Sequence, residues 1–196
     1  MEMEEKATEG ERLEGLNQLY LAIIQRYKGY IEEEESLSVA ELPTLVTPQS
    51  EKVADKAAEI MDDFEHYTYD TDFYDASVKA LEFVKDSIAE VVLPLQFWLT
   101  PTDTLTFKMG DAVDKCVLLC SLLIKMGNPS AKVFMKMYDT TRSVVVYYDY
   151  NGKTYMLDIK DGVREFASRE QLLGSLGIND DVTAYEFNDK MYVDIA

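Results

Sequence analysis

The chain has 196 residues, of which 47% are hydrophobic, and its formal net charge is −18. This length and hydrophobic content are sufficient for one domain with a core and argue against disorder. The strong negative charge excludes non-specific binding to nucleic acids and to anionic membranes, because both carry negative charge themselves. No apolar run approaches the ~20 residues of a membrane-spanning helix. We therefore expect neither nucleic-acid nor membrane partners.

The two cysteines and the N-terminus indicate a cellular compartment. Cys116 and Cys120 are one helical turn apart, and side chains four apart on a straight helix usually diverge too far for a disulfide. They are predicted to be buried free thiols in a reducing environment. The acidic segment 1–15 has no apolar signal core. We expect a cytoplasmic protein.

The N-terminal half is predicted to be helical, because apolar residues recur at steps of three and four. The three expected helices have these apolar faces: Leu13, Leu16, Tyr20, Ile23, Tyr27 and Ile31; Val53, Ala57, Ile60, Met61 and Phe64; Val78, Leu81, Val84, Ile88 and Val91. The aromatic and acidic segment 66–75 is predicted to be a loop. We therefore assign a helical extension to residues 1–74 and a domain to residues 75–196, packed as one compact unit.

The C-terminal half combines one buried helix with antiparallel strands. Residues 111–126 are apolar almost all round, which is typical of a helix inside a domain. Asn151-Gly152 between two strand-like runs is a strong hairpin signal. The expected strands are 131–138, 143–150 and 153–158, followed by a short helix after Ser168 and a last hairpin in 183–196. This order predicts an α+β fold.

The start of the buried helix is a place where thiol chemistry is favourable. The helix follows Gly110-Asp111, and its N-terminus carries unpaired N–H groups and a partial positive charge. A cysteine at such a position has a lowered pKa. A histidine on the facing strand and an acid on the next would complete a catalytic triad.

The segment 97–123, FWLTPTDTLTFKMGDAVDKCVLLCSLL, resembles the core of the transglutaminase-like superfamily in its archaeal and bacterial members. The matching positions are Trp98, Thr100, Pro101, Thr104, Leu105, Gly110, Asp111, Asp114 and Lys115. The hairpin at Asn151-Gly152 and the ending at Asp158 continue the resemblance, which covers roughly residues 78–160. It implies a papain-like/transglutaminase-like core, with the buried central helix packed on an antiparallel sheet and preceded by the N-terminal helices.

The catalytic positions of that superfamily are altered in this chain. Its cysteine corresponds to Ala112, its histidine to Ser143, and only its aspartate is retained, as Asp158. A methyl group is no nucleophile and a serine is no general base, so the resemblance implies a fold without its activity. We expect a pseudoenzyme whose cleft is lined by Trp98, Asp111 and Cys116.

Three hypotheses follow for the function. The first is a catalytically inactive transglutaminase-like domain that binds a protein or peptide or serves as a structural module. The second is an active thiol acyltransferase or cysteine peptidase of the same fold, with Ala112 replacing a natural cysteine or with Cys116 as the nucleophile. The third is an acidic interaction protein for a basic partner. No cofactor or metal is expected, because zinc spacing, an EF-hand loop and a P-loop are all absent from the sequence.

Overall fold

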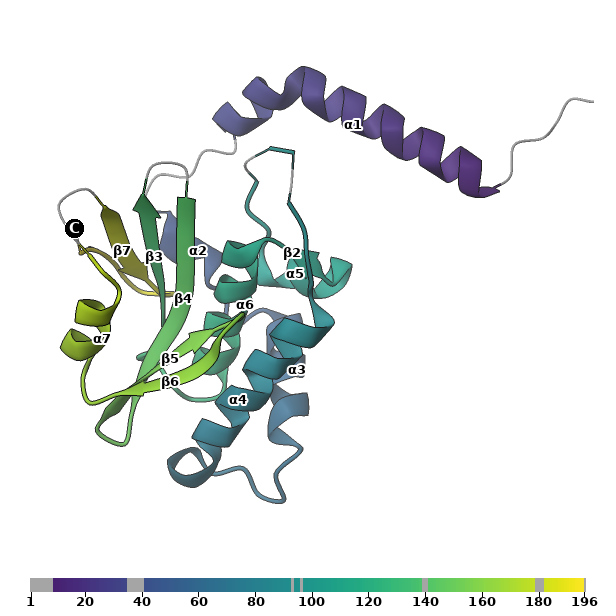
Figure 1. Ribbon diagram of the computed structural model, residues 1–196. Coiled ribbons are helices and arrows are strands. Elements are labelled where there is room, and N and C mark those ends of the chain that lie inside the picture. The colour runs from purple at the N-terminus through teal and green to yellow at the C-terminus, as the bar shows by residue number, and fades with distance from the viewer. Residues whose placement is uncertain are drawn as a thin grey trace, which may run out of the picture. The chain divides into compact units, whose positions relative to one another are not determined.

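The computed structural model describes residues 9–34, 41–92, 94–95, 97–138, 141–178 and 182–195. They divide into two compact units (Figure 1). The first contains helix α1 (Glu9–Glu34) with the described part of segment 94–97, and the second contains all the other elements. The first predicted helix is therefore confirmed, and its expected apolar face is exposed at Leu13, Leu16, Tyr20, Ile23 and Tyr27.

The second unit is an α+β domain. Its helices are α2 (Leu42–Leu45), α3 (Glu51–Met61), α4 (Tyr69–Ser87), α5 (Pro101–Phe107), α6 (Ala112–Lys125) and α7 (Arg169–Ser175). Its strands are β1 (Ala89–Glu90), β2 (Met109–Gly110), β3 (Lys132–Tyr138), β4 (Thr141–Tyr150), β5 (Lys153–Asp158), β6 (Gly162–Phe166), β7 (Thr183–Phe187) and β8 (Tyr192–Asp194). Strands β1 and β2 form a short parallel pair, and the other six form an antiparallel sheet in the order β6-β5-β4-β3-β7-β8.

Helix α6 is the centre of this domain, as predicted. Its residues from Val113 to Leu123 are all buried, and it contacts α3, α4 and α5 as well as β3 and β4 of the sheet. In Figure 1 it lies between the sheet and the helices α3 and α4. A helix that is apolar on all sides requires such an enclosure. The predicted α+β fold with a buried helix on an antiparallel sheet is confirmed.

The two faces of the sheet bury two separate apolar clusters. Val144, Val146 and Tyr148 of β4 pack in the cluster that contains α6, whereas Val145 and Tyr147 pack in the cluster of Leu172 on α7. This follows from the period of two in a strand, which turns successive side chains to opposite faces. The large cluster therefore encloses α6. The N-terminus of α6 lies beside the start of β4 and the end of β5.

Helix α4 begins at Tyr69, inside the segment 66–75 that was predicted to be a loop. Asp70 and Asp72 stand in its first turn, and Asp72 accepts a hydrogen bond from the backbone N–H of Thr68 at 2.7 Å. Carboxylates are favourable at a helix N-terminus, so acidic residues that suggested a loop instead start the helix. The predicted boundary between residues 74 and 75 thus falls within α4, whose buried Phe73 shares one core with α6.

Within the described residues, no helix has both the length and the apolar character needed to cross a membrane.

Candidate functional site

A pocket of about 150 Å³ lies where the start of α6 meets the ends of β4 and β5. It is lined by Ala112, Lys115 and Cys116 of α6, Arg142, Ser143 and Val144 of β4, Asp158, Ile159 and Lys160 at the end of β5, and Glu90 of β1. The structure therefore brings Ala112, Ser143 and Asp158 together around one pocket, although they are far apart in the sequence.

The start of α6 is held by two reciprocal aspartates. Asp111 Oδ1 accepts hydrogen bonds from the backbone N–H groups of Val113 at 2.7 Å and Asp114 at 2.9 Å. Asp114 in return accepts from the N–H groups of Asp111 at 2.9 Å and Leu99 at 3.0 Å. Such a capping box satisfies the first donors of a helix. Asp111, predicted to line the cleft, is committed to this cap and is not among the residues that line the pocket.

Gly110 permits the close approach that the cap needs. A Cβ atom at this position would lie 2.8 Å from the Cβ of Asp114, which is closer than two carbon atoms can pack. Any larger residue would push Asp114 away from the N–H of Asp111. The Gly-Asp pair before the helix therefore has a structural reason that is independent of catalysis.

The carboxyl group of Asp114 has an unusual environment. Burial and the negative charge of Asp111 raise its pKa from 3.8 to about 7, against the opposing effect of the hydrogen bonds from the backbone of Asp111 and Leu99. The folded state then holds a proton that the unfolded chain releases, so its stability falls as the pH rises from about 4 to about 7.

We expect carboxyl ¹³C NMR to detect one aspartate that titrates near pH 7 in the native protein. This resonance should be missing from an Asp114→Asn variant, which identifies it. Asp103, in the capping box of α5, provides the control, because Asp103→Asn should leave the resonance in place. Titration of every aspartate below about pH 5 would contradict the expected environment of Asp114.

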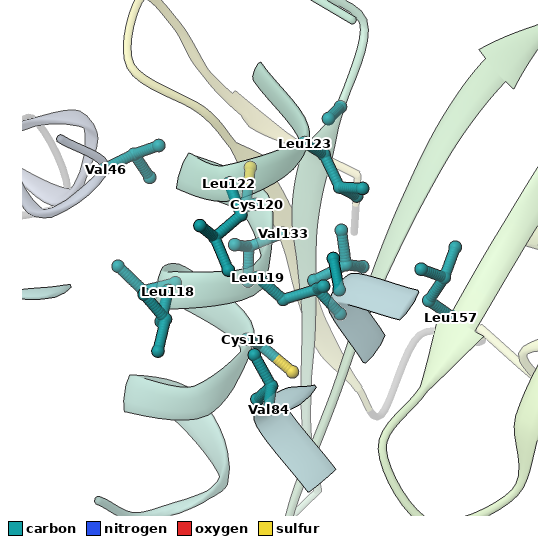
Figure 2. Close-up of a cluster of buried hydrophobic side chains, with 14 of the residues drawn as sticks. Val46, Val84, Cys116, Leu118, Leu119, Cys120, Leu122, Leu123, Val133 and Leu157 are labelled. Atoms are coloured by element: carbon teal, nitrogen blue, oxygen red, sulfur yellow. The ribbon is translucent and has the colours of Figure 1, made fainter. Parts of the chain in front are cut away.

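Cys116 lines the pocket but is only 1% exposed. Burial raises the pKa of its thiol far above the ordinary value, and the negative charges of Asp158 and Asp111 add to this effect. Cys120, one turn further along, is also buried with a raised pKa. Figure 2 shows both sulfur atoms among leucine and valine side chains of the core. Since the thiolate is the reactive form, both cysteines are structural in this state.

Asp158 acts in the turn that follows β5. Its Oδ1 accepts hydrogen bonds from the backbone N–H groups of Lys160 at 2.8 Å and Asp161 at 3.2 Å. These bonds fix the turn into β6 and keep the carboxylate at the pocket. The retained aspartate thus has a structural function whether or not a histidine stands beside it.

Strand β4 offers no general base to the pocket. Ser143 is exposed and in phase with Val145 and Tyr147, so by strand alternation it belongs to the face opposite α6, while Val144 belongs to the face of α6. The third lining residue, Arg142, carries a guanidinium group, which donates hydrogen bonds and has no acceptor. Whichever of the three stands at the histidine position, none can accept a proton from a nucleophile.

Two further residues considered from the sequence lie outside the lining of this pocket. Trp98 is half-buried and packs against the large apolar cluster, so it is a core residue. His66 is exposed in the turn before α4. Sequence reasoning had not assigned a role to Lys115, Arg142 or Lys160, which do line the pocket. Lys115 could have been found, since a lysine in a helix that is buried all round must itself be buried.

A second pocket, of about 460 Å³, lies among α3, α4 and α5. Lys52 and Lys56 line it, but Lys52 donates to Thr106 Oγ1 at 2.6 Å and Lys56 pairs with Glu59. Two of the three lysines that line it are therefore already engaged. In the described part of the chain, no three side chains of histidine, cysteine, aspartate or glutamate gather to hold a metal ion.

No protein-family model matches the chain, and no curated protein matches it. The solved structure of Legionella pneumophila LapG is similar, with a TM-score of 0.52 at 14% identity over 81% of this chain and 88% of that one. The EGTA-treated form of the same protein gives a TM-score of 0.51, again at 14% identity, and covers 81% of this chain and 86% of that one. At this identity the likeness shows the fold alone. It agrees with the papain-like/transglutaminase-like α+β core expected from the sequence.

Proposed function

We propose that this chain is a catalytically inactive transglutaminase-like domain that binds a peptide or protein segment at the pocket of Ala112, Ser143 and Asp158. The observation that carries the proposal is that these three residues line one pocket. Where the resemblance places cysteine and aspartate, the pocket has the methyl group of Ala112 and the carboxylate of Asp158, and strand β4 contributes no base to it. A pocket without a nucleophile and a base can hold a substrate-like chain but cannot cleave or transfer it.

The neighbouring groups do not replace the missing chemistry. Cys116 is the nearest thiol to the start of α6, and its raised pKa leaves it protonated. The hydroxyl of Ser143 has no hydrogen-bonded base among the described residues, and a serine is a weak nucleophile without one. What remains is a helix N-terminus, a carboxylate and a small cavity, which suit recognition.

The activity test uses the purified protein with amine donors and glutamine-containing peptides, and separately with peptides as substrates for hydrolysis. No turnover above the uncatalysed rate is expected. A fluorophosphonate probe tests the remaining hydroxyl, and it should not label Ser143. Turnover that thiol reagents abolish, or labelling of Ser143, would overturn the inactive state.

The binding test uses short peptides selected against the native protein. Ala112→Leu fills the pocket and should abolish their binding. Ala58→Leu makes the same change on the exposed face of α3, outside the pocket, and should leave binding unchanged. Selected peptides that bind both variants equally would show that the pocket is not the binding site.

The second candidate, an active thiol enzyme, is favoured by the position of Cys116 at the pocket. We expect iodoacetamide to modify Cys116 only after denaturation, because the native thiol is buried and protonated. Ala112→Cys is the positive control, since its thiol at the start of α6 should be alkylated in the native state. Fast native labelling at Cys116 would support the thiol enzyme instead. The double variant Ala112→Cys with Ser143→His, assayed for the same activities, tests whether the scaffold supports catalysis.

Two other expectations from the sequence stay predictions. A cytoplasmic location accords with two buried free cysteines. Binding of a basic partner through the acidic surface accords with the net charge of −18. Association with a cationic protein that weakens as salt is added would support the second, because salt screens exposed charges.

A further inference from the structure

Lys115 has a mostly buried side chain that opens onto the pocket. It stands on α6 less than one turn after Ala112, lines the pocket, and is only 4% exposed. Among the residues that the structure describes, none forms an ion pair or a hydrogen bond with its amine. The amine is not among the fully enclosed polar atoms of the described residues, so it reaches water through the pocket. Lysine side chains with so little exposure normally have a counter-charge.

The acids of the pocket are already engaged. Asp158 Oδ1 accepts the backbone N–H groups of Lys160 and Asp161, and Glu90 lies 3.8 Å from the amine of Lys160. Arg142, at the start of β4, has no ion pair or hydrogen bond with any described residue. The lining thus combines three cations, Lys115, Arg142 and Lys160, with two acids, Glu90 and Asp158, although the net charge of the chain is −18.

The start of α6 supplies a third favourable group. Asp111 caps the backbone N–H groups of Val113 and Asp114, but the first N–H, that of Ala112, is outside this cap. Free N–H groups and the partial positive charge at a helix N-terminus favour an anion. The N-terminus of α6, the buried Lys115 and the rim residue Arg142 all favour the same sign of charge in this pocket.

We propose that the pocket binds a single carboxylate of a peptide, with Lys115 as the buried counter-charge, Arg142 at the rim and the Ala112 N–H as a donor. This inference rests on the proposed peptide-binding function and names the group that is recognised. The volume of about 150 Å³ is below the ~300–1,000 Å³ of pockets that enclose a whole small molecule, so it suits one functional group of a longer chain. The acidic surface disfavours polyanions, and a lone carboxylate needs only this local compensation.

The probes are three peptides that differ in one group: acetyl-Ala-Ala-Ala with a free carboxylate, acetyl-Ala-Glu-Ala-amide, and the neutral acetyl-Ala-Gln-Ala-amide. Binding is followed by the amide ¹H–¹⁵N shifts of Ala112 and Ser143. At least one carboxylate peptide should bind ten-fold or more tightly than the neutral one. Binding of acetyl-Ala-Ala-Ala would show that the pocket recognises the carboxylate of a chain terminus. Binding of acetyl-Ala-Glu-Ala-amide would show that it recognises the carboxylate of an acidic side chain.

Lys115→Met keeps the length of the side chain and removes its charge. It should weaken the binding of the carboxylate peptide ten-fold or more. It should also raise the melting temperature of the unliganded protein, because it removes a charge from a mostly buried side chain that has no ion pair with the described residues. If Lys115 had only a structural role, Lys115→Met would instead lower the melting temperature. Lys153→Met, at an exposed pair with Glu165, is the matched control and should change neither.

The outcomes separate the two proposals. If the neutral and charged peptides bind equally, and Ala112→Leu abolishes this binding, the peptide-binding function is supported. The proposed recognition of a carboxylate is then contradicted. Unchanged affinity in Lys115→Met would overturn the role of the lysine. Failure of all three peptides to bind, together with no peptide selected against the pocket, would overturn both.

Discussion

Replacing Glu186 with alanine is expected to lower the free energy of unfolding by about 3–5 kcal/mol, as for other buried ion pairs that lose one partner. Glu186 of β7 is 1% exposed. Its Oε1 lies 2.7 Å from Lys132 Nζ, and its Oε2 lies 2.8 Å from Arg169 Nη2 and also accepts the hydroxyl of Tyr147. Alanine would leave two cations and one phenol without their shared acceptor on the α7 side of the sheet.

The pH dependence of this contribution has a definite sign. Burial alone would raise the pKa of Glu186, but the hydrogen bonds from Lys132, Tyr147 and Arg169 outweigh it and lower the pKa below 4.5. A carboxylate with a lowered pKa stabilises the fold above its unfolded pKa and loses that contribution as the pH falls through its folded pKa. The difference between the native chain and Glu186→Ala should therefore shrink below pH 4.5.

The measurement is urea unfolding followed by circular dichroism at pH 7 and at decreasing pH. The matched control is Glu165→Ala, because Glu165 also pairs with a lysine, Lys153, at 2.6 Å, but both side chains are half-exposed. An exposed pair contributes about 0–1 kcal/mol. If Glu186→Ala costs no more than Glu165→Ala, the buried network does not stabilise this sheet.

The elements that were predicted correctly are those with strong local signals. Helix α6 was evident from its apolar residues on all sides, and the hairpin between β4 and β5 from Asn151-Gly152. Both turn residues have positive φ, 49° for Asn151 and 74° for Gly152, which is the backbone that an Asn-Gly hairpin turn requires. Local sequence was sufficient because these features depend on few distant contacts.

The start of α4 and the short β6 depend on distant contacts and were missed. The hydroxyl of Tyr150 donates to the backbone carbonyl oxygens of Tyr69 at 3.0 Å and Asp70 at 2.6 Å, across about eighty positions of the chain. Periodicity within 66–75 contains no trace of that partner. Strand β6 exists because it pairs with β5 at the edge of the sheet, and its own sequence has weak alternation.

The residues expected at the candidate site depend on both kinds of signal. The order of Ala112, Ser143 and Asp158 along a helix and two strands was readable, and the pocket does contain all three. Trp98 and Asp111 were also expected in the lining. Trp98 instead packs against the large apolar cluster, and Asp111 belongs to the capping box of α6. Whether such a side chain lies in the cleft or in the core depends on packing between distant segments, which the sequence of one segment does not reveal.

Phe73→Ala is expected to destabilise the domain by about 3–5 kcal/mol, the usual cost of removing a buried phenylalanine. Phe73 is 0% exposed on α4. Its ring centroid lies 5.0 Å from those of Tyr69 and Tyr148 and 5.4 Å from that of Tyr150. The change removes a large apolar side chain and leaves a cavity between α4 and β4 that the surrounding rings cannot fill.

The control for Phe73→Ala is Phe107→Ala at the end of α5, where the side chain is 57% exposed. Surface changes of this kind usually stay within about 0.5 kcal/mol. Thermal and urea unfolding of both variants decide where the domain begins, because Phe73 lies on the N-terminal side of the boundary predicted between residues 74 and 75. A cost for Phe73→Ala as small as that for Phe107→Ala would mean that the start of α4 belongs to a dispensable extension. The expected large cost would make residues before 75 part of the same folding unit as α6.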